Sequence, residues 1–159
     1  MEQFHIRAAI RTDKEAIADL WVELMKYHRS LDLRFHIDPK GRKIYLNHTQ
    51  EMIRSASCKV LVAEKIETGE VVGYLMGELQ NRPPGAQTGT FGFISDIFVK
   101  NEWRQRGVGT ALFDEMKRWF TLKKASAVEL YIAQANPEAA EFWRSMGLHP
   151  FLTLMQLEL

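Results

Sequence analysis

The sequence predicts a single α/β domain built on a mixed β-sheet, and three observations lead to this prediction. Segments with the alternation of strands and segments with the periodicity of helices follow each other along the 159 residues in the order β-α-α-β-β-β-α-β-α-β. The first half contains a hairpin, whereas the second half has the alternation typical of parallel strands. No internal repeat or low-complexity segment divides the chain. We therefore expect one domain over residues 1–159, with helices on both faces of the sheet.

The first three elements are a short strand and two amphipathic helices. Residues 4–10 alternate as a strand, and Thr12 with Glu15 forms a predicted capping box for the first helix. Its apolar stripe consists of Ile17, Leu20, Trp21, Leu24 and His28. The pair Asp38-Pro39 predicts the start of a second helix that reaches about residue 55. The expected buried face of that helix consists of Tyr45, His48, Met52 and Ile53.

The next segments form a hairpin and then a third strand. Residues 59–65 and 71–80 read as two strands joined by a turn over residues 67–70. Residues 81–89 contain two prolines and two glycines, which predicts a loop. Residues 90–99 read as the strand that follows the loop.

The second half continues with helices and strands in alternation. Residues 108–123 have one apolar face and predict a helix, and residues 126–133 alternate as a strand. The pair Asn136-Pro137 starts a short helix, which Gly147 ends as a left-handed C-cap. Residues 151–159 are expected to close the chain as a strand.

Composition excludes several functional classes. The formal net charge is +1, so no overall field attracts nucleic acid or an anionic membrane. No apolar run is long enough to span a membrane, and we expect a cytoplasmic protein. The single cysteine, Cys58, precedes an apolar run and is expected to be a buried structural thiol rather than a reactive one.

The turn that connects residues 90–99 to the following helix has the chemistry of an anion site. Gly107 and Gly109 allow an anion to approach the main chain, and free N–H groups at a helix N-terminus point toward it. Arg104 and Arg106 supply donors suited to phosphate oxygens. The turn lacks the Gly-Lys-Ser/Thr ending of a P-loop, and Leu112 stands where a dinucleotide fingerprint requires glycine.

The pattern Arg104-x-x-Gly107-x-Gly109 resembles the signature of the GCN5-related N-acetyltransferase (GNAT) family. A second stretch, from Asn136 to Gly147, resembles another conserved segment of that family. The resemblance implies an N-acetyltransferase that uses acetyl-coenzyme A and no metal. It implies that Ile97, Phe98 and Val99 offer backbone groups to the pantetheine arm. The implied pyrophosphate cradle consists of Arg104, Gln105, Arg106, Gly107, Val108, Gly109 and Thr110, and the implied pantetheine-facing residues of the last helix are Asn136, Ala140 and Trp143.

Catalytic residues are less well defined by the sequence. Asp96 is the first candidate for a general base, and it is equally a candidate for a structural or acceptor-binding carboxylate, because Ser95 stands where polyamine-acetylating family members have glutamate. Glu78, His28 and His36 are alternatives. Trp143 occupies the position where many members have a tyrosine that protonates the thiolate, and an indole cannot act as an acid near neutral pH. Tyr131 is an alternative donor.

The acceptor is expected to bind between residues 29–37, the second helix and the loop 81–89. Acidic side chains there (Asp32, Asp38 and Glu78) are mixed with Arg34, Arg42 and Arg82. The region therefore lacks the continuous acidic groove that a polyamine acceptor would need. We expect a small-molecule amine as the acceptor. A peptide or protein amine, or a non-catalytic acyl-coenzyme A sensor, are the alternatives. The apolar final strand also suggests a homodimer.

Overall fold

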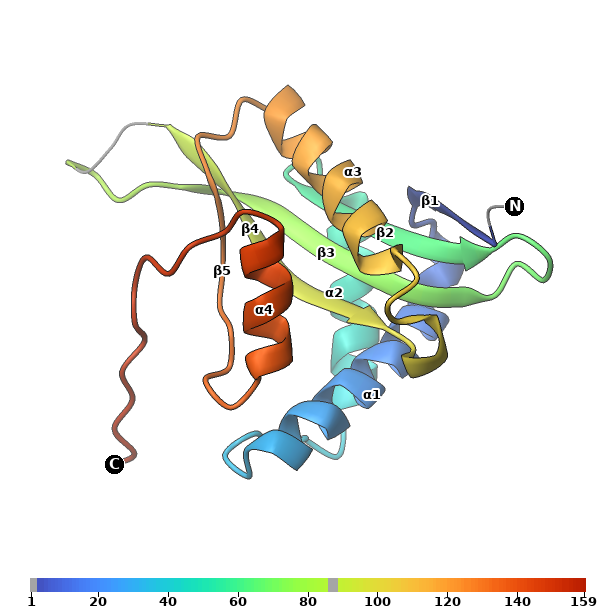
Figure 1. The fold of residues 1–159 in the computed structure, drawn as a ribbon, viewed down its shortest axis with the longest axis horizontal. Helices are drawn as coiled ribbons and strands as arrows, with labels where there is room; N and C mark the ends of the chain where they lie inside the picture. Colours follow the sequence, from blue (N-terminus) through green and yellow to red (C-terminus); the bar gives the residue numbers. More distant parts are fainter. Residues whose placement is uncertain (1–2, 86–88) are drawn as a thin grey trace.

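The structure, a computed structural model, describes residues 3–85 and 89–159. Its centre is a five-stranded sheet in the order β1-β2-β3-β4-β5 (Figure 1). The strands are β1 (Phe4–Ala8), β2 (Cys58–Lys65), β3 (Val71–Asn81), β4 (Thr90–Val99) and β5 (Val128–Leu130). Neighbouring strands from β1 to β4 are antiparallel, whereas β4 and β5 are parallel. The predicted mixed sheet is confirmed.

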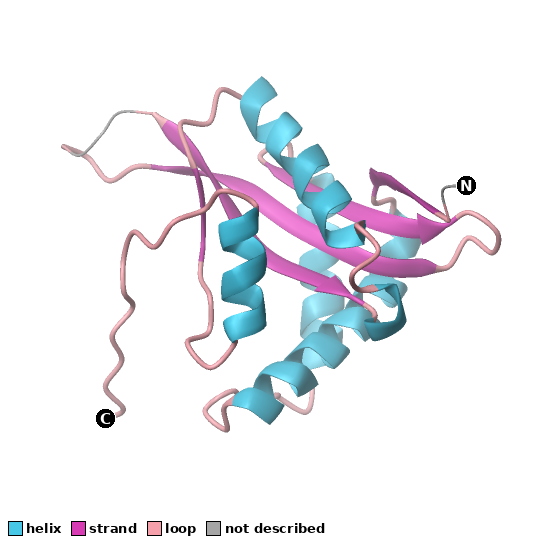
Figure 2. Cartoon of the chain, in the orientation of Figure 1, coloured by secondary structure: helices cyan, strands magenta, loops and turns pink. Residues whose placement is uncertain are grey.

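Helices cover both faces of the sheet, as the sequence predicts (Figure 2). On one face lie α1 (Lys14–Leu31) and α2 (Gly41–Arg54), and on the other lie α3 (Val108–Leu122) and α4 (Pro137–Ser145). Two 3-10 turns, Arg11–Asp13 and Asn101–Trp103, precede α1 and α3. Each face has its own core: Ile17, Leu20, Tyr45, Met52 and Tyr74 under α1 and α2, and Leu75, Leu112, Met116, Phe120 and Trp143 under α3 and α4.

The starts of the first two helices differ from the predicted ones. Instead of a Thr12–Glu15 capping box, the Asp13 carboxylate accepts a hydrogen bond from the Ile10 N–H at 2.7 Å. Helix α2 begins at Gly41 rather than at Pro39. The Asp38 carboxylate accepts a hydrogen bond from the Lys40 N–H at 2.6 Å and so closes a turn before the helix. Both carboxylates accept from a nearby main-chain N–H, which lies three residues before Asp13 and two residues after Asp38. Short acidic side chains commonly cap turns in this way.

Two burial predictions are corrected by the packing. His48 is exposed, because the buried face of α2 runs through Tyr45, Thr49 and Met52 instead. Cys58 is half-buried rather than buried, since it opens β2 at the edge of the core. Within the described residues, no helix is long and apolar enough to cross a membrane.

Two strands predicted in the C-terminal third are shorter or absent. β5 covers only Val128–Leu130 of the predicted 126–133, because the chain diverges from β4 beyond Leu130. Residues 151–159, predicted as the final strand, pair with no strand and are exposed throughout. A strand exists only where a neighbouring edge receives its backbone hydrogen bonds. Figure 1 shows this segment leaving α4 and running outside the sheet.

Candidate active site

A cleft opens where β4 and β5 separate. The two strands pair only through Gly92↔Val128, Phe93↔Glu129 and Ile94↔Leu130. β4 then continues to Val99 along β3, so its other edge is free. The resulting cleft has a volume of about 500 Å³ and is lined by β4, the turn after it, α1, α4 and residues 130–133. This size is ordinary for a site that holds a small molecule or a cofactor arm.

The turn from β4 to α3 presents an uninterrupted row of free main-chain donors. Gly107 is the N-cap of α3 in the left-handed region, with φ 81°, and Gln105 is also left-handed, with φ 56°. Among the described residues, none of the N–H groups of residues 105–110 donates a hydrogen bond. Alternating right- and left-handed residues at a helix N-terminus create a concave anion site, which the helix dipole reinforces. The turn therefore suits a diphosphate.

The two arginines of the turn have different positions. Arg104 lines the cleft, and its Nε donates to the Val99 carbonyl oxygen at 3.0 Å. Its guanidinium also lies over the rings of Tyr27 and Phe98. The two Nη nitrogens remain without a partner in the described part of the chain and are free to bind phosphate. Arg106 instead lies over Trp103 and donates to Gln3 at 3.3 Å.

Most residues predicted to bind the cofactor surround this cleft. Those that line it are Ile97, Phe98, Val99, Arg104, Gln105, Gly107, Gly109, Thr110, Asn136 and Trp143. Arg106, Val108 and Ala140 do not line it. The Val108 side chain is buried in the core under α3, which leaves only its free N–H for the turn. Ala140 lies beside the lining, and Ala139 and Phe142 of the same helix line the cleft instead.

Helix α4 forms one wall of the cleft. Asn136 caps it, because its Oδ1 accepts a hydrogen bond from the Ala139 N–H at 3.0 Å. Gly109 allows close contact between α3 and α4: an added Cβ would stand 3.3 Å from the Phe142 ring. Trp143 is buried and meets Phe113 edge-on, with ring centroids 5.2 Å apart. Trp143 is thus part of the core and of the cleft floor at once.

Asp96 of β4 lines the cleft, and its carboxylate is hydrogen-bonded by a residue of α2. The Tyr45 hydroxyl donates to Asp96 Oδ2 at 2.9 Å. Burial raises the pKa of the Asp96 carboxyl above its ordinary value, while the Tyr45 hydrogen bond and the nearby His48 and His28 lower it. The net effect is upward, which makes the carboxylate a stronger base than an exposed aspartate.

His28 is the second titratable group near Asp96. It lines the cleft from α1 and stacks on Phe35, with ring centroids 4.9 Å apart. Its Nδ1 is buried and has no hydrogen-bond partner among the described residues. Burial lowers the pKa of His28, and the charge of Asp96 raises it, with a net decrease. The alternatives Glu78 and His36 do not line the cleft.

Tyr131, the residue directly after β5, also lines the cleft. It is 74% exposed, and its ring meets Phe93 edge-on at 5.3 Å. Tyr131, Asp96 and Trp143 all line the same cleft. The three predicted catalytic residues are therefore brought together, although their individual roles remain predictions.

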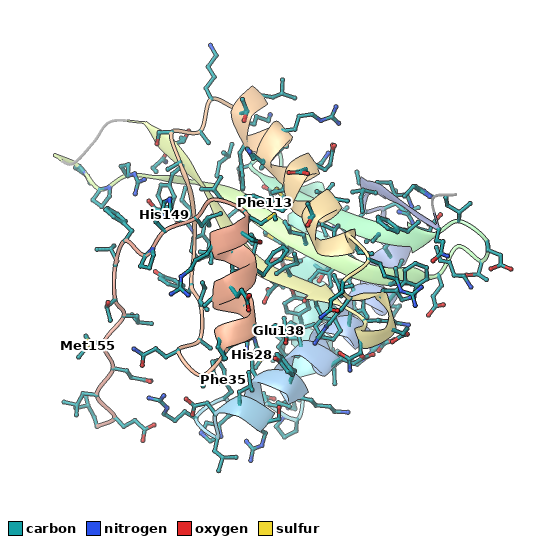
Figure 3. The ribbon with its side chains drawn as sticks, in the orientation of Figure 1. His28, Phe35, Phe113, Glu138, His149 and Met155 are labelled. Atoms are coloured by element: carbon teal, nitrogen blue, oxygen red, sulfur yellow. The ribbon has the colours of Figure 1, made fainter. Side chains whose placement is uncertain are left out.

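Sequence reasoning missed one link across the cleft. The Tyr27 hydroxyl of α1 donates to Glu138 Oε2 of α4 at 3.2 Å, and both residues line the cleft. Figure 3 labels Glu138 near His28 and Phe35, where the end of α1 approaches the start of α4. Nothing in the chain order connects these two residues, because a contact between residues 111 positions apart depends on how the helices pack.

Charged residues expected around the acceptor are mostly paired with one another. Asp32 binds Arg34, which lowers the pKa of Asp32 to about 2. Arg42 binds Glu15 and Asp19, and Arg82 binds Glu129. Of the predicted loop 81–89, residues 86–88 lie outside the described part. Asp96 is thus the acidic group of β4 that remains available to the cleft.

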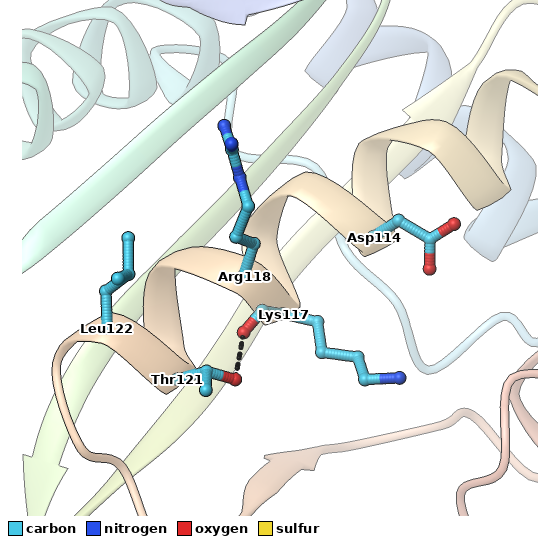
Figure 4. Close-up of a pocket in the computed structure, with 5 residues that line it drawn as sticks. All are labelled: Asp114, Lys117, Arg118, Thr121 and Leu122. Carbon is cyan, nitrogen blue, oxygen red and sulfur yellow. Dashed lines mark hydrogen bonds between the residues drawn. The ribbon is translucent and has the colours of Figure 1, made fainter.

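A second hollow lies on the outer face of α3 and contains none of the predicted site residues. Its lining consists of Asp114, Lys117, Arg118, Thr121 and Leu122, all from one helix (Figure 4). The Thr121 hydroxyl donates to the Lys117 carbonyl oxygen at 2.8 Å, within the helix. A hollow on one helix face has no opposing wall, so it does not enclose a ligand.

Comparisons with known proteins agree with this geometry. The model of the acetyltransferase (GNAT) family matches residues 18–148, and the chain belongs to that family. L-amino acid N-acetyltransferase AaaT of Escherichia coli (strain K12) is 27% identical over 151 residues, which cover 92% of this chain and 83% of that protein.

Solved structures share the fold. A mutant of the BH1408 protein from Bacillus halodurans superimposes with a TM-score of 0.88 at 23% identity, covering 98% of this chain and 99% of that one. The aminoglycoside N-acetyltransferase AAC(6')-Iy in complex with CoA gives a TM-score of 0.76 at 18% identity, covering 98% of this chain and 93% of that one. At such identities the likeness concerns the fold alone.

Proposed function

We propose that the protein transfers the acetyl group of acetyl-coenzyme A to the primary amine of a small molecule. The observation that carries this proposal is the row of free N–H groups over residues 105–110, which follows the end of β4 beyond the edge that β5 leaves free. The names of its relatives, which include an L-amino acid and an aminoglycoside N-acetyltransferase, support a small amine as the acceptor.

The residues present fit coenzyme A. The turn supplies the main-chain donors that a diphosphate requires, and Arg104 adds the free ends of its guanidinium. The free edge of β4 over residues 96–99 leads from the turn toward Asp96. A pantetheine arm in the cleft would lie along this edge, because its amide groups can replace the missing strand partner.

Acetyl-coenzyme A supplies an activated thioester, and the residues of this chain prepare the amine. An alkylamine with a pKa of about 10.4 is protonated at pH 7, and its free form lies roughly 4.6 kcal/mol higher. Asp96 accepts the first ammonium proton, and the nitrogen lone pair then forms the N–C bond as the C–S bond breaks. The acetylated nitrogen releases its second proton to water, which leaves a neutral amide. A backbone N–H on the Ile97–Val99 strand stabilises the carbonyl oxygen. The departing thiolate, with a pKa near 8.5, takes a proton from water or from Tyr131.

The test is a panel of amines offered with acetyl-coenzyme A, in which free thiol and acetylated product are both measured. Small primary amines are expected to give acetylated product in equal amount to the thiol. If only peptides were acetylated, the acceptor would be a peptide or protein amine instead of a small molecule. Tight binding of coenzyme A without turnover on any amine would instead indicate a sensor.

We further propose that the protein is a homodimer assembled through residues 151–159. Six large apolar side chains of this segment are at least 75% exposed: Phe151, Leu152, Leu154, Met155, Leu157 and Leu159. Contiguous apolar surface of this kind marks an interaction site. The sheet also ends at β5, whose outer edge has no strand partner among the described residues. In a symmetric dimer, residues 151–159 of each copy could pack against the same segment or against the β5 edge of the other copy.

Light scattering after size-exclusion chromatography tests the dimer. The full chain is expected at twice its 18.4 kDa mass, and Leu154→Glu with Leu157→Glu is expected to give a monomer. A full-length chain that stays monomeric at high concentration would contradict the proposal.

A further inference from the structure

An irregularity in β4 turns Asp96 toward α2. Met76 pairs with Asp96, and Gly77 pairs with Ile94, so Ser95 has no partner and forms a β-bulge. The Ser95 hydroxyl donates to the Met76 carbonyl oxygen at 3.3 Å. Residues two apart in a regular strand share a face, but the extra residue reverses this. Ile94 therefore packs in the core under α3, whereas Asp96 meets α2.

Tyr45 is the α2 residue that Asp96 meets, and its ring is tightly packed. Its ring is 7% exposed and stacks on Trp21 with centroids 4.6 Å apart and planes 11° from parallel. The Tyr45 hydroxyl lies 2.9 Å from Asp96 Oδ2 and 3.4 Å from the Tyr74 hydroxyl. A hydroxyl has one proton, and the shorter contact to a carboxylate is the stronger bond. The single proton of Tyr45 therefore goes to Asp96 rather than to Tyr74.

We propose that Tyr45 is a positioning residue, which binds Oδ2 of Asp96 so that Oδ1 is presented to the ammonium group of the acceptor. Oδ1 makes no hydrogen bond with any described residue, and Asp96 lines the cleft. This proposal rests on the proposed function, because it assumes an amine in the cleft. In the reaction, the N–H bond of the ammonium breaks and its proton moves to Oδ1. The nitrogen electron pair is thereby released for attack.

The pH dependence follows from the groups that face Asp96. These are Tyr74 from β3, Tyr45 and His48 from α2, and His28 from α1. The hydrogen bond from Tyr45 stabilises the carboxylate form and so lowers the pKa of Asp96 against the upward effect of burial. Its removal should raise this pKa further. Since the base must be ionised to act, the acid limb of the activity profile should then move to higher pH.

The experiment compares Tyr45→Phe with Tyr74→Phe. Both variants lose one hydroxyl and keep the ring, but only Tyr45 touches Asp96. In each, the carboxyl pKa of Asp96 is measured by carbon NMR, with Asp96→Asn to assign the signal. The pH profile of kcat/KM, the KM for acetyl-coenzyme A and thermal unfolding are measured in parallel.

Tyr45→Phe is expected to raise the carboxyl pKa and the acid limb together. It should lower kcat about tenfold, an effect typical of a misplaced proton acceptor, and leave the KM for acetyl-coenzyme A within about twofold. Tyr74→Phe leaves the Tyr45–Asp96 hydrogen bond in place and should change both quantities clearly less. A Tyr45→Phe carboxyl titration equal to that of the wild type would overturn the proposal, whether or not activity is lost.

The NMR measurement separates this proposal from the proposed function. If the wild type acetylates no amine, the proposed function fails, and the proposal that Oδ1 serves an ammonium fails with it, while the titration still reports whether Tyr45 holds the carboxylate. If the wild type is active and only the titration is unchanged, the proposed function stands and the role of Tyr45 alone is refuted.

Discussion

The Arg104 side chain is hydrogen-bonded to the main chain of Val99: its Nε donates to the Val99 carbonyl oxygen at 3.0 Å. The bond joins the last residue of β4 to Arg104 and so closes the segment 100–103, directly before residues 105–110. This side-chain hydrogen bond adds to the main-chain bonds from the Trp103 and Arg104 N–H groups to the carbonyl oxygens of Lys100 and Asn101.

Replacing Arg104 by lysine tests this arrangement. Arg104→Lys retains the charge but loses the Nε donor and the planar contacts with Tyr27 and Phe98. We expect coenzyme A to bind about tenfold more weakly, because arginine and lysine are not equivalent at forked or stacked sites. Arg106→Lys is the matched control, since Arg106 lies over Trp103 outside the cleft. Calorimetry that shows equal losses for both variants would refute the distinction.

Gly92 in β4 is expected to tolerate no side chain. An added Cβ would stand 2.6 Å from the atoms of the Phe120 ring, which covers this part of the strand. Gly92→Ala should therefore lower the free energy of unfolding by about 1–3 kcal/mol, as overpacking does. Chemical denaturation measures the loss. In a Phe120→Leu background the same substitution should cost clearly less, and an equal cost in both backgrounds would exclude the Phe120 contact as the cause.

The pair of Arg7 and Asp13 predicts how stability depends on pH. Arg7 donates to both oxygens of Asp13, at 2.7 and 3.0 Å. Burial raises the pKa of Asp13, but the hydrogen bonds from Arg7 and Ile10 lower it more, so the net change is downward. A carboxyl whose folded pKa is lowered stabilises the fold above its unfolded pKa, about 3.9, and this contribution is lost as the pH falls through the folded value.

Asp13→Asn should accordingly lower the free energy of unfolding by roughly 2 kcal/mol at neutral pH. Its difference from the wild type should shrink as the pH falls below about 3.9. Asp19→Asn serves as the control, because its partner Arg42 and Asp19 itself are exposed and such pairs contribute about 0–1 kcal/mol. Urea denaturation over a pH series that shows a constant difference for Asp13→Asn would contradict the assignment.

Several parts of the fold and site were predictable because they depend on local chemistry. Periodicity defined β4 over residues 90–99, and glycine placement defined the turn at Gly107. The Asn136-Pro137 pair defined the start of α4, where the asparagine side chain indeed caps the helix. In each case neighbouring residues alone determine the structure.

Other parts depend on partners that are distant in sequence. The bulge at Ser95 arises from pairing with β3, and it decides that Asp96 faces Tyr45. Asp96 was identified from its residue type and strand, but its hydrogen-bond partner was not. Similarly, the apolar character of residues 151–159 favours a strand, yet these residues pair with no strand of the described chain.

The binding of coenzyme A to two variants of Gly107 tests the central claim most directly. An added Cβ there meets no protein atom within 4 Å, so Gly107→Asn and Gly107→Asp differ mainly in charge, and asparagine tolerates the left-handed backbone. Calorimetry should give Gly107→Asn an affinity within about fivefold of the wild type. Gly107→Asp should bind at least about thirtyfold more weakly, because a carboxylate would lie beside the diphosphate. Wild-type affinity in folded Gly107→Asp would show that the amides of residues 105–110 do not hold the cofactor.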